Sequence, residues 1–351
     1  MIRTRERLCI STSITCNSRF ANQCRIGATP DQDREVTSRS VIPIVPLKDT
    51  GEVMSIHANA KSGSKTGITR HVAREGDARD LSFIGTESVH LVCTSPPYGS
   101  LKTYPDHPSQ LGNITSYDRF LSELDKVWSE CLRILVPGGR VACVVGDVCI
   151  SRRQAGRHYV LPLSADLQVR ARRVGFDCLT PIRWLKVANI KLEASRSSRF
   201  LGKPNLPNGV VKNDIEHILF FRKPGGYRKP TLEMERRSLI STDDYSKWFS
   251  PVWSDVSGQL RTGHPAPYPV EIPRRLVRMF SFASDTVVDP FAGTGTTALA
   301  ALETGRNSIN VEIEPSYVEM MTKRLRSHSP TAIIEIDRSI RAFQEIPSAA
   351  E

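Results

Sequence analysis

The stretch Ser95-Pro96-Pro97-Tyr98 combines groups that suit one chemical task, holding a planar exocyclic amine while a methyl group is delivered to it. Such an amine is a poor nucleophile because its lone pair is delocalised into the ring of the base. The Ser95 hydroxyl oxygen and the Pro96 carbonyl can accept its two hydrogens and draw it toward a tetrahedral, reactive state. Proline fixes φ and lacks an N–H, and the Tyr98 ring offers a face on which a base can stack. An ordinary exit from a strand into a loop also favours Ser and Pro, so this stretch alone leaves both interpretations open.

A second stretch, Asp289-Pro290-Phe291-Ala292-Gly293-Thr294-Gly295-Thr296, follows an apolar run and precedes a helical pattern. Glycines let a ligand approach the backbone closely, and the N-terminus of the helix that follows is electropositive. Glu312 ends the next apolar run, where a carboxylate can accept hydrogen bonds from ribose hydroxyls. The pattern Gly293-x-Gly295-x-x-Ala298 also fits the fingerprint of nicotinamide enzymes, which by itself is weak evidence. In a nicotinamide enzyme, however, the stretch Ser95-Pro96-Pro97-Tyr98 would have no purpose.

Together the two stretches resemble the S-adenosylmethionine-dependent DNA amino-methyltransferases, over roughly residues 70 to 327. The tetrapeptide precedes the glycine-rich stretch, which is similar to the circularly permuted beta order of that family. Ser95 resembles the N4-cytosine members, because N6-adenine members usually carry Asp at this position. The resemblance implies an α/β fold of the Rossmann-like methyltransferase type, with a mostly parallel sheet, helices on both faces and a small target-recognition insertion.

The resemblance also implies which residues surround the cofactor. In the family an acidic residue before the catalytic strand hydrogen-bonds the adenine amine, and Asp77 is similar to it. His264 lies in a segment similar to one that lines the methionine end, although its surroundings also fit an ordinary turn. The residues expected around S-adenosylmethionine are Asp77, His264, Asp289, Phe291, Gly293, Gly295, Thr296 and Glu312.

Two segments are expected to contact duplex DNA. The long loop of residues 188–213 resembles a family loop that meets the DNA backbone, and its basic residues include Lys191, Arg196, Arg199 and Lys203. Residues 223–262 occupy the position of the family's target-recognition region. Their basic residues, Arg228 and Lys229 among them, are interleaved with aromatic residues, which suits contacts to phosphates and bases. A surface excursion with aromatic side chains packed beneath it is the alternative.

The mechanism implied by the resemblance begins with flipping the target base out of the duplex. The amine, held by Ser95 and Pro96, then attacks the sulfonium methyl group directly, without a covalent enzyme intermediate or a metal. The first alternative is the same chemistry on adenine N6. A second is an RNA or protein amine methyltransferase, in which the tetrapeptide more often begins with Asn. A third is a non-catalytic DNA-binding relative, in which a damaged motif is expected.

The composition agrees with a polyanionic partner. The 351-residue chain has a formal net charge of +11, and residues 152–237 contain 19 Lys and Arg against 7 Asp and Glu. The eight cysteines include no C-x-x-C pair, and no His cluster has ligand spacing, which argues against structural zinc. No apolar run is long enough to span a membrane. We therefore expect a protein of the prokaryotic cytoplasm or nucleoid, monomeric or dimeric, that acts alone or beside a cognate restriction endonuclease.

Apolar spacing predicts the elements that position these stretches. A buried strand over residues 89–93 leads into the tetrapeptide, and a helix over 117–135 has Ser116 as its N-cap. Further strands are expected over 140–145, 181–187, 215–221 and 308–311, and helices over 163–174, over 271–282 and from Pro315 onward. Residues 70–222 and 263–327 would then form the catalytic and cofactor-binding halves of one domain. Residues 1–55 and 328–351 are predicted to be a disordered extension and a loose tail.

Overall fold

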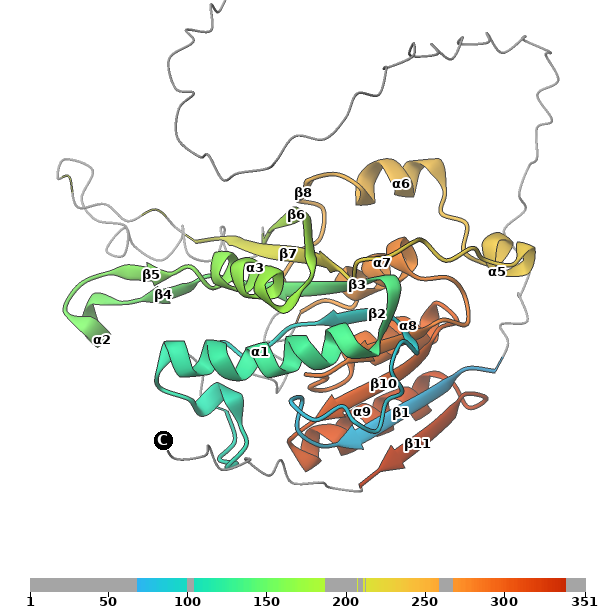
Figure 1. The fold of residues 1–351 in the computed structure, drawn as a ribbon, viewed down its shortest axis with the longest axis horizontal. Helices are drawn as coiled ribbons and strands as arrows, with labels where there is room; N and C mark the ends of the chain where they lie inside the picture. Colours follow the sequence, from blue (N-terminus) through green and yellow to red (C-terminus); the bar gives the residue numbers. More distant parts are fainter. Residues whose placement is uncertain are drawn as a thin grey trace, which may run out of the picture. The chain divides into compact units, whose positions relative to one another are not determined.

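A nine-stranded sheet forms the framework of the computed structural model, which describes residues 68–99, 104–186, 207, 211, 213–258 and 268–338 (Figure 1). Across the sheet the strands lie in the order β11 (Ile333–Asp337), β1 (Arg70–Glu75), β10 (Asn307–Glu312), β9 (Thr286–Asp289), β2 (Val89–Thr94), β3 (Leu135–Val145), β7 (Ile215–Arg222), β6 (Asp177–Leu185) and β8 (Val252–Trp253). β7 is antiparallel to both of its neighbours, and every other pair is parallel. The predicted, mostly parallel sheet is confirmed.

Parallel pairing places the ends of β1, β10, β9, β2 and β3 along one side of the sheet, the carboxyl edge. The amino edge is the opposite side, where these strands begin. β2 and β9 are direct neighbours, with Leu91 opposite Val287 and Val92 opposite Val288. The two stretches that carry the expected chemistry follow these strands, so they meet at the carboxyl edge, where open α/β sheets bind their ligands.

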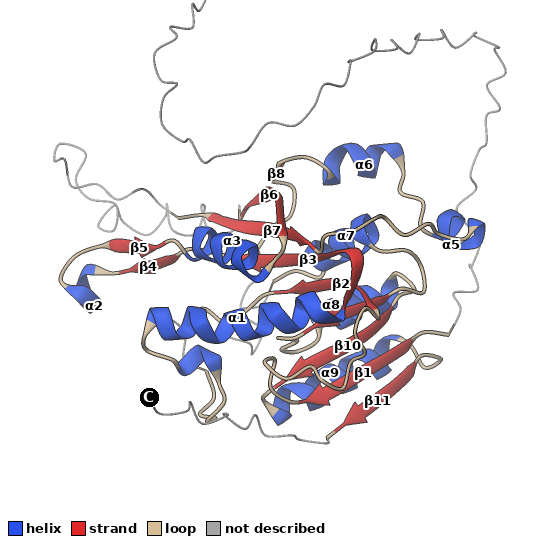
Figure 2. Ribbon diagram, viewed as in Figure 1, coloured by secondary structure: helices blue, strands red, loops and turns tan. Residues whose placement is uncertain are grey.

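Helices cover both faces of the sheet, as predicted (Figures 1 and 2). One face packs against α1 (Tyr117–Ile134) and α3 (Leu163–Val174), and the other against α7 (Glu271–Phe280), α8 (Thr296–Glu303) and α9 (Pro315–His328). α1 begins as predicted, because Ser116 Oγ accepts a hydrogen bond from the Arg119 N–H at 3.4 Å. Trp128 on its apolar stripe is fully buried and packs edge-on against Phe221 of β7.

Several short elements were not predicted, since their apolar runs are too short to show a period. β4 (Val148–Ile150) and β5 (Tyr159–Leu161) form an antiparallel hairpin that projects from the sheet, with α2 (Arg152–Ala155) at its tip (Figure 1). The 3-10 helix η2 (Leu111–Asn113) precedes α1. α5 (Leu232–Arg237) and α6 (Thr242–Trp248) lie between β7 and β8.

The tail predicted to be loose instead contributes a strand. Residues 333–337 form β11, which pairs in parallel with β1 at the border of the sheet. Arg70 and Arg74 of β1 form ion pairs with Glu335 and Asp337 across this pair. An edge strand buries little apolar surface, so its sequence gives a weak pattern. The predicted extension, residues 1–55, lies outside the described residues.

Candidate active site

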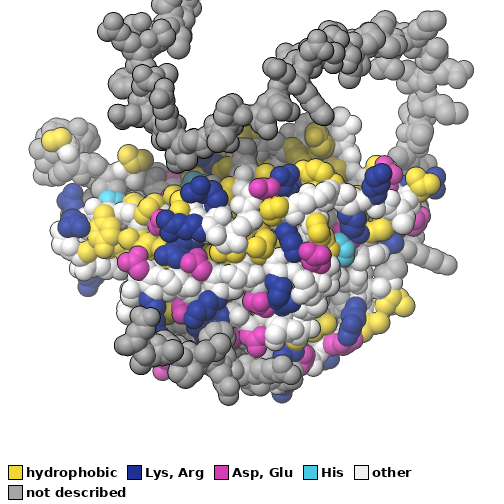
Figure 3. Space-filling view, viewed as in Figure 1, with side chains coloured by type: hydrophobic (Ala, Val, Ile, Leu, Met, Phe, Trp, Pro, Cys, Tyr) yellow, Lys and Arg dark blue, Asp and Glu magenta, His cyan; other side chains and the backbone are white. Residues whose placement is uncertain are grey.

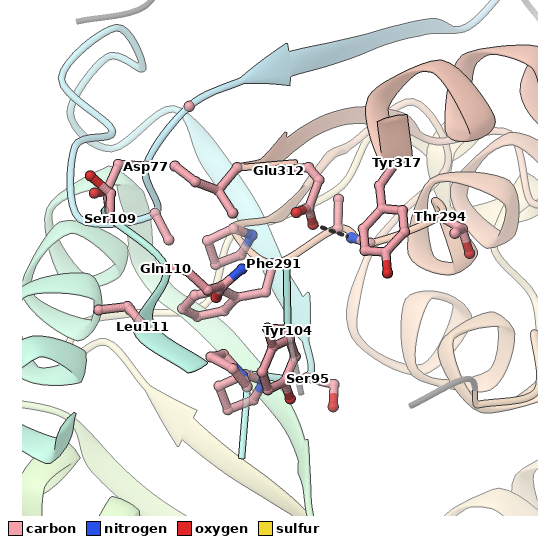
Figure 4. Close-up of a pocket in the computed structure, with 18 of the residues that line it drawn as sticks. Asp77, Ser95, Tyr104, Ser109, Gln110, Leu111, Phe291, Thr294, Glu312 and Tyr317 are labelled. Carbon is pink, nitrogen blue, oxygen red and sulfur yellow. Dashed lines mark hydrogen bonds between the residues drawn. The ribbon is translucent and has the colours of Figure 1, made fainter. Parts of the chain in front are cut away.

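A pocket opens at the carboxyl edge, among the residues that follow β1, β2, β9 and β10. It encloses an empty volume of about 870 Å³, partly open to solvent, which suits a small organic ligand. Ser95 and Tyr104 lie at one end of the pocket in Figure 4, and Asp77 lies at the other. The predicted residues found in its wall are Asp77, Ser95, Pro96, Pro97, Tyr98, Phe291, Gly293, Thr296 and Glu312. The tetrapeptide and most of the expected cofactor residues thus share one cavity.

Hydrogen bonds fix the tetrapeptide around the partly exposed Ser95. The Tyr98 N–H donates to the Tyr104 hydroxyl oxygen at 3.1 Å. The Tyr98 hydroxyl lies 3.5 Å from Oε1 of Glu216, whose carboxylate pairs with Lys186. Burial, with a further contribution from the Glu216 charge, raises the pKa of Tyr98 well above its usual range. The Tyr98 phenol therefore stays protonated at neutral pH and holds its ring in place.

A buried polar network ties the end of β2 to the end of β9. Thr94 Oγ1 donates to Oδ1 of Asp289 at 2.6 Å, and the Phe291 N–H donates to the same oxygen at 3.0 Å. The Thr297 hydroxyl also bonds Asp289 and lies 2.8 Å from the Tyr268 hydroxyl. Burial nevertheless raises the pKa of Asp289 to about 6. Asp289 is not among the described residues of the pocket wall, and its hydrogen bonds give it a positioning role between the two segments. Its contact with the cofactor stays a prediction.

Glu312 ends β10 and faces the pocket (Figure 4). Its Oε2 accepts the Gly293 N–H at 2.7 Å, and its Oε1 accepts the Glu314 N–H at 3.0 Å. Burial raises the pKa of Glu312 to about 7. Each carboxylate oxygen has a further lone pair, so Glu312 can hold the glycine turn and still accept hydroxyl donors from a ligand.

The two predicted glycines have different roles. Gly293, with a φ of +52°, lines the pocket and presents its N–H to Glu312. Gly295, with a φ of +80°, is not part of the described wall. A Cβ at Gly295 would lie 2.5 Å from Cγ of Met321 in α9. The structure therefore gives Gly295 a role in the close packing of α8 on α9, while its predicted contact with a ligand stays a prediction.

Asp77 lies in the pocket wall and is held there by Arg79, which was not predicted from the sequence as part of the site. The Arg79 guanidinium donates from Nη2 to Oδ2 of Asp77 at 2.6 Å, and the Arg79 N–H donates to Oδ1 at 2.9 Å. Arg79 also pairs with Glu123 of α1. This chain of charges anchors Asp77 to the helix layer, so its carboxylate has a fixed place at the end of the pocket.

Tyr104, Gln110 and Tyr317 belong to the pocket wall and were not predicted as site residues (Figure 4). The Tyr104 ring packs directly on Gly112, where a Cβ would lie 2.3 Å from it, and burial raises the pKa of Tyr104 to about 12. Tyr317, in the first turn of α9, also lies in the pocket wall. The hydroxyl group of Tyr317 could have indicated this position from the sequence, because a fully buried site would separate that hydroxyl from water.

The predicted contacts to DNA fall into two groups. Lys191, Arg196, Arg199 and Lys203, like the predicted cofactor residue His264, lie outside the described residues. The loop that carries the four basic residues starts and ends at the carboxyl edge, where the Lys186 N–H donates to the Asp214 carbonyl at 3.0 Å. Lys186 and Asp214, the described residues that flank this loop, therefore lie on the side of the pocket.

Arg228 and Lys229, in contrast, lie at the amino edge. Because β7 runs antiparallel, the chain leaves it at this edge, where the Gly138 N–H donates to the Lys223 carbonyl at 3.0 Å. Arg228 then pairs with the buried Asp285, which directly precedes β9. The length of the strands separates both residues from the tetrapeptide, so the structure does not support them as contacts to DNA around the target base.

Two further features concern only the part of the chain that the structure describes. No group of three or more His, Cys, Asp or Glu side chains is arranged there to hold a metal ion. No helix in those ranges is both long enough and apolar enough to cross a membrane.

Known proteins with similar sequences define the family. A family model described as DNA methylase, of the N6 and N4 type, matches residues 89–323. The Type II methyltransferase M.MjaI of Methanocaldococcus jannaschii is 36% identical over 289 residues, which cover 73% of this chain and 91% of that protein. M.MthZI of Methanothermobacter thermautotrophicus is 33% identical over 284 residues, covering 73% and 77%. The chain belongs to the S-adenosylmethionine-dependent DNA amino-methyltransferases.

Solved structures agree with this assignment. A protein of Thermus thermophilus, named as a DNA modification methylase and solved with S-adenosyl-L-methionine, is 43% identical with a TM-score of 0.64, covering 78% of this chain and 100% of that one. The PvuII DNA methyltransferase, named as cytosine-N4-specific, is 20% identical with a TM-score of 0.50, covering 77% and 99%. At that identity the PvuII enzyme supports the fold alone. The Rossmann-like methyltransferase fold is confirmed.

Proposed function

We propose that this protein transfers a methyl group from S-adenosylmethionine to the N4 amine of cytosine in duplex DNA. The observation that carries the proposal is the shared pocket, in which Ser95 lies in the same cavity as Glu312 and Gly293. The relatives named as Type II methyltransferases support DNA as the substrate and a cognate restriction endonuclease as a partner. Ser95, in the position where adenine enzymes usually carry Asp, supports cytosine.

The groups in the pocket fit a nucleoside cofactor. Glu312 offers oxygen lone pairs to ribose hydroxyls, and the Phe291 ring offers a surface for adenine. Asp77, held by Arg79, offers an acceptor to the adenine amine. Bound in this way, S-adenosylmethionine would supply the sulfonium methyl group.

The residues of the tetrapeptide position the amine. Flipping the target base costs on the order of a few kcal/mol, which stacking on the Tyr98 ring offsets. The Ser95 hydroxyl oxygen and the Pro96 carbonyl then accept the two hydrogens of the amine and aim its lone pair. Ser95 is a poor base, and burial raises the pKa of Tyr98, so its phenol is already protonated at neutral pH. Neither group therefore removes the proton from the amine, and the proton passes to water.

The proposal is tested by determining which polymer receives the methyl group. In separate reactions, full-length protein and methyl-labelled S-adenosylmethionine are incubated with unmethylated duplex DNA, with tRNA or with a protein mixture. We expect label in the duplex DNA only. Label in tRNA or protein would instead support an amine methyltransferase of another substrate class. Cofactor binding without transfer to any polymer would support a non-catalytic relative.

A further inference from the structure

The hairpin of β4, α2 and β5 has no role in the reaction described above, yet it starts beside the catalytic tetrapeptide. It leaves the carboxyl edge directly after β3, at Gly146, where a Cβ would lie 3.7 Å from the Tyr98 ring. Six residues of extended chain from Gly146 to Arg152, at about 3.3 Å each, carry its tip about 20 Å outward. Figure 1 shows the hairpin projecting past the end of the sheet.

The tip of the hairpin is basic and has no acidic residues. Arg152, Arg153 and Arg157 are exposed, His158 follows them, and residues 148–161 contain no Asp or Glu. No carboxylate oxygen of a described residue lies within 4.0 Å of these three guanidinium groups. Many other arginines of the domain, such as Arg275, are paired with carboxylates. Dark-blue side chains lie at this projecting end in Figure 3.

Hydrogen bonds define the shape of the hairpin at its tip and at its base. Gln154 Oε1 accepts the N–H of Ser151 at 3.0 Å and its hydroxyl at 2.8 Å, and Gly156 ends α2 with a φ of +70°. At the base, Asp147 Oδ1 accepts the Ser164 N–H of α3 at 2.8 Å. Tyr159 and Val160 of β5 are 36% and 43% exposed. The burial of these apolar side chains therefore does not hold the hairpin in place. A preformed arm loses little conformational entropy when it binds.

We infer that this hairpin is a phosphate clamp, in which Arg152, Arg153 and Arg157 contact the backbone of duplex DNA beside the flipped base. Arginine presents a planar fork of donors that matches phosphate oxygens. About 20 Å of reach corresponds to roughly six base pairs along a strand, at about 3.4 Å per phosphate. The clamp therefore adds affinity and register, not base readout. This inference rests on the proposed action on duplex DNA.

The test compares two triple variants that each remove three positive charges. R152Q/R153Q/R157Q removes the clamp. R172Q/R173Q/K229Q removes exposed charges at the amino edge, where α3 ends and Lys229 lies. Binding to a labelled duplex of about 30 base pairs is measured across a series of NaCl concentrations. Each phosphate contact contributes about 0.9 to the slope of log affinity against log salt.

We expect the hairpin variant to lose about 2 to 3 from this slope and to bind at least about tenfold more weakly at low salt, while the amino-edge variant keeps the wild-type slope. R152K/R153K/R157K should recover the slope, because it restores the charge, whereas damage to the fold of the hairpin would not be rescued in this way. Equal slopes in all four proteins, or equal losses in both triple-Gln variants, would overturn the clamp.

The clamp and the proposed function fail in different ways. If wild-type protein transfers no methyl group to duplex DNA, the proposed function is wrong, whatever the slopes are. If wild-type protein methylates duplex DNA but the hairpin variant matches it in slope and in KM for DNA, only the clamp is wrong.

Discussion

At the scale of single residues, we expect Ser95 to position the amine of the base without contributing to the affinity for the cofactor. Ser95 lies at one end of the pocket and Asp77 at the other. Removing one preorganised hydrogen-bonding group from a reacting centre commonly costs about 10²–10³ in rate. We therefore expect Ser95→Ala to lower kcat on DNA at least about 100-fold, while its affinity for S-adenosylmethionine, measured by calorimetry, stays near that of the wild type.

The matched control for this prediction is Ser129→Ala, which removes a hydroxyl from the exposed side of α1. It should keep wild-type kcat. A Ser95→Ala protein that turns over normally, or that fails to bind the cofactor, would contradict the division of roles.

Glu312 gives the ligand-free protein a pH-dependent stability. Burial raises its pKa in the folded state from an ordinary 4.5 to about 7. Between these values the folded protein keeps a proton that the unfolded chain has lost, so the stabilisation is full below pH 4.5 and is lost as the pH rises to about 7. The loss amounts to no more than about 3 kcal/mol. Burial lowers the pKa of His71 from 6.5 to about 4, which changes stability in the opposite direction below about pH 6.5. We therefore expect the fall due to Glu312 to appear as a difference between the wild type and Glu312→Gln in urea titrations without cofactor.

Glu312→Gln should remove this part of the pH dependence, whatever it does to absolute stability. Asp289, whose pKa burial raises from 3.8 to about 6, changes stability in the same direction at lower pH, and His71 changes it in the opposite direction up to about pH 6.5. The interval from about 6.5 to 7 therefore reports mainly on Glu312. Glu319→Gln, at an exposed position of α9, is the control and should keep the wild-type slope. A slope unchanged in Glu312→Gln would refute the shifted titration.

Sequence reasoning located the residues that project from strand ends but not the direction in which each side chain points. Ser95 and Glu312 follow apolar runs directly, and both are found in the pocket wall. Asp289 and Gly295 belong to the same kind of stretch, yet one bonds Thr94 and the other packs on α9. Spacing along the chain specifies neighbours in sequence, whereas these roles depend on tertiary contacts.

At the scale of elements, Gly295 and Met321 define how closely α8 and α9 pack. Gly295→Ala combines a left-handed backbone with a Cβ 2.5 Å from Met321 Cγ, and we expect it to lower the free energy of unfolding by about 1–3 kcal/mol. Met321→Ala alone leaves a cavity and should cost about 2–5 kcal/mol. In the Gly295→Ala background the second change should cost less, since it relieves the contact. Purely additive losses in urea titrations would show that the two residues do not press on each other.

Elements with long apolar patterns were predictable and short or peripheral ones were not. The predicted bounds of α3 match the structure, and the start of α1 at Ser116 is confirmed, because a helix buries a stripe with a measurable period. β11 and the β4–β5 hairpin are short and half exposed, so local composition carried little information about them. The antiparallel direction of β7 could not be predicted from its apolar run, and it decides that Arg228 lies at the amino edge.

At the scale of the whole molecule, the site depends on joining two halves of the chain that are distant in sequence. Thr94 and Asp289 make this junction through one buried hydrogen bond. Thr94→Val leaves a buried carboxylate with one donor fewer, which should cost about 1–3 kcal/mol of stability and reduce turnover by loosening β2 against β9. Thr94→Ser keeps the hydroxyl and should behave nearly as the wild type.

A double-mutant cycle with Asp289→Asn measures the junction itself. If Thr94 and Asp289 act through each other, the double variant should lose less stability than the sum of the single losses. Simple addition of the two losses would mean that the halves are held together elsewhere in the sheet.

The most direct test of the account is the identity of the methylated nucleoside. Unmethylated duplex DNA is incubated with the protein and methyl-labelled S-adenosylmethionine, digested to nucleosides and separated. The account predicts N4-methylcytosine, with no label when Ser95 is replaced by Ala. N6-methyladenine as the product would preserve the fold and the direct transfer but contradict the claim that Ser95 marks a cytosine enzyme.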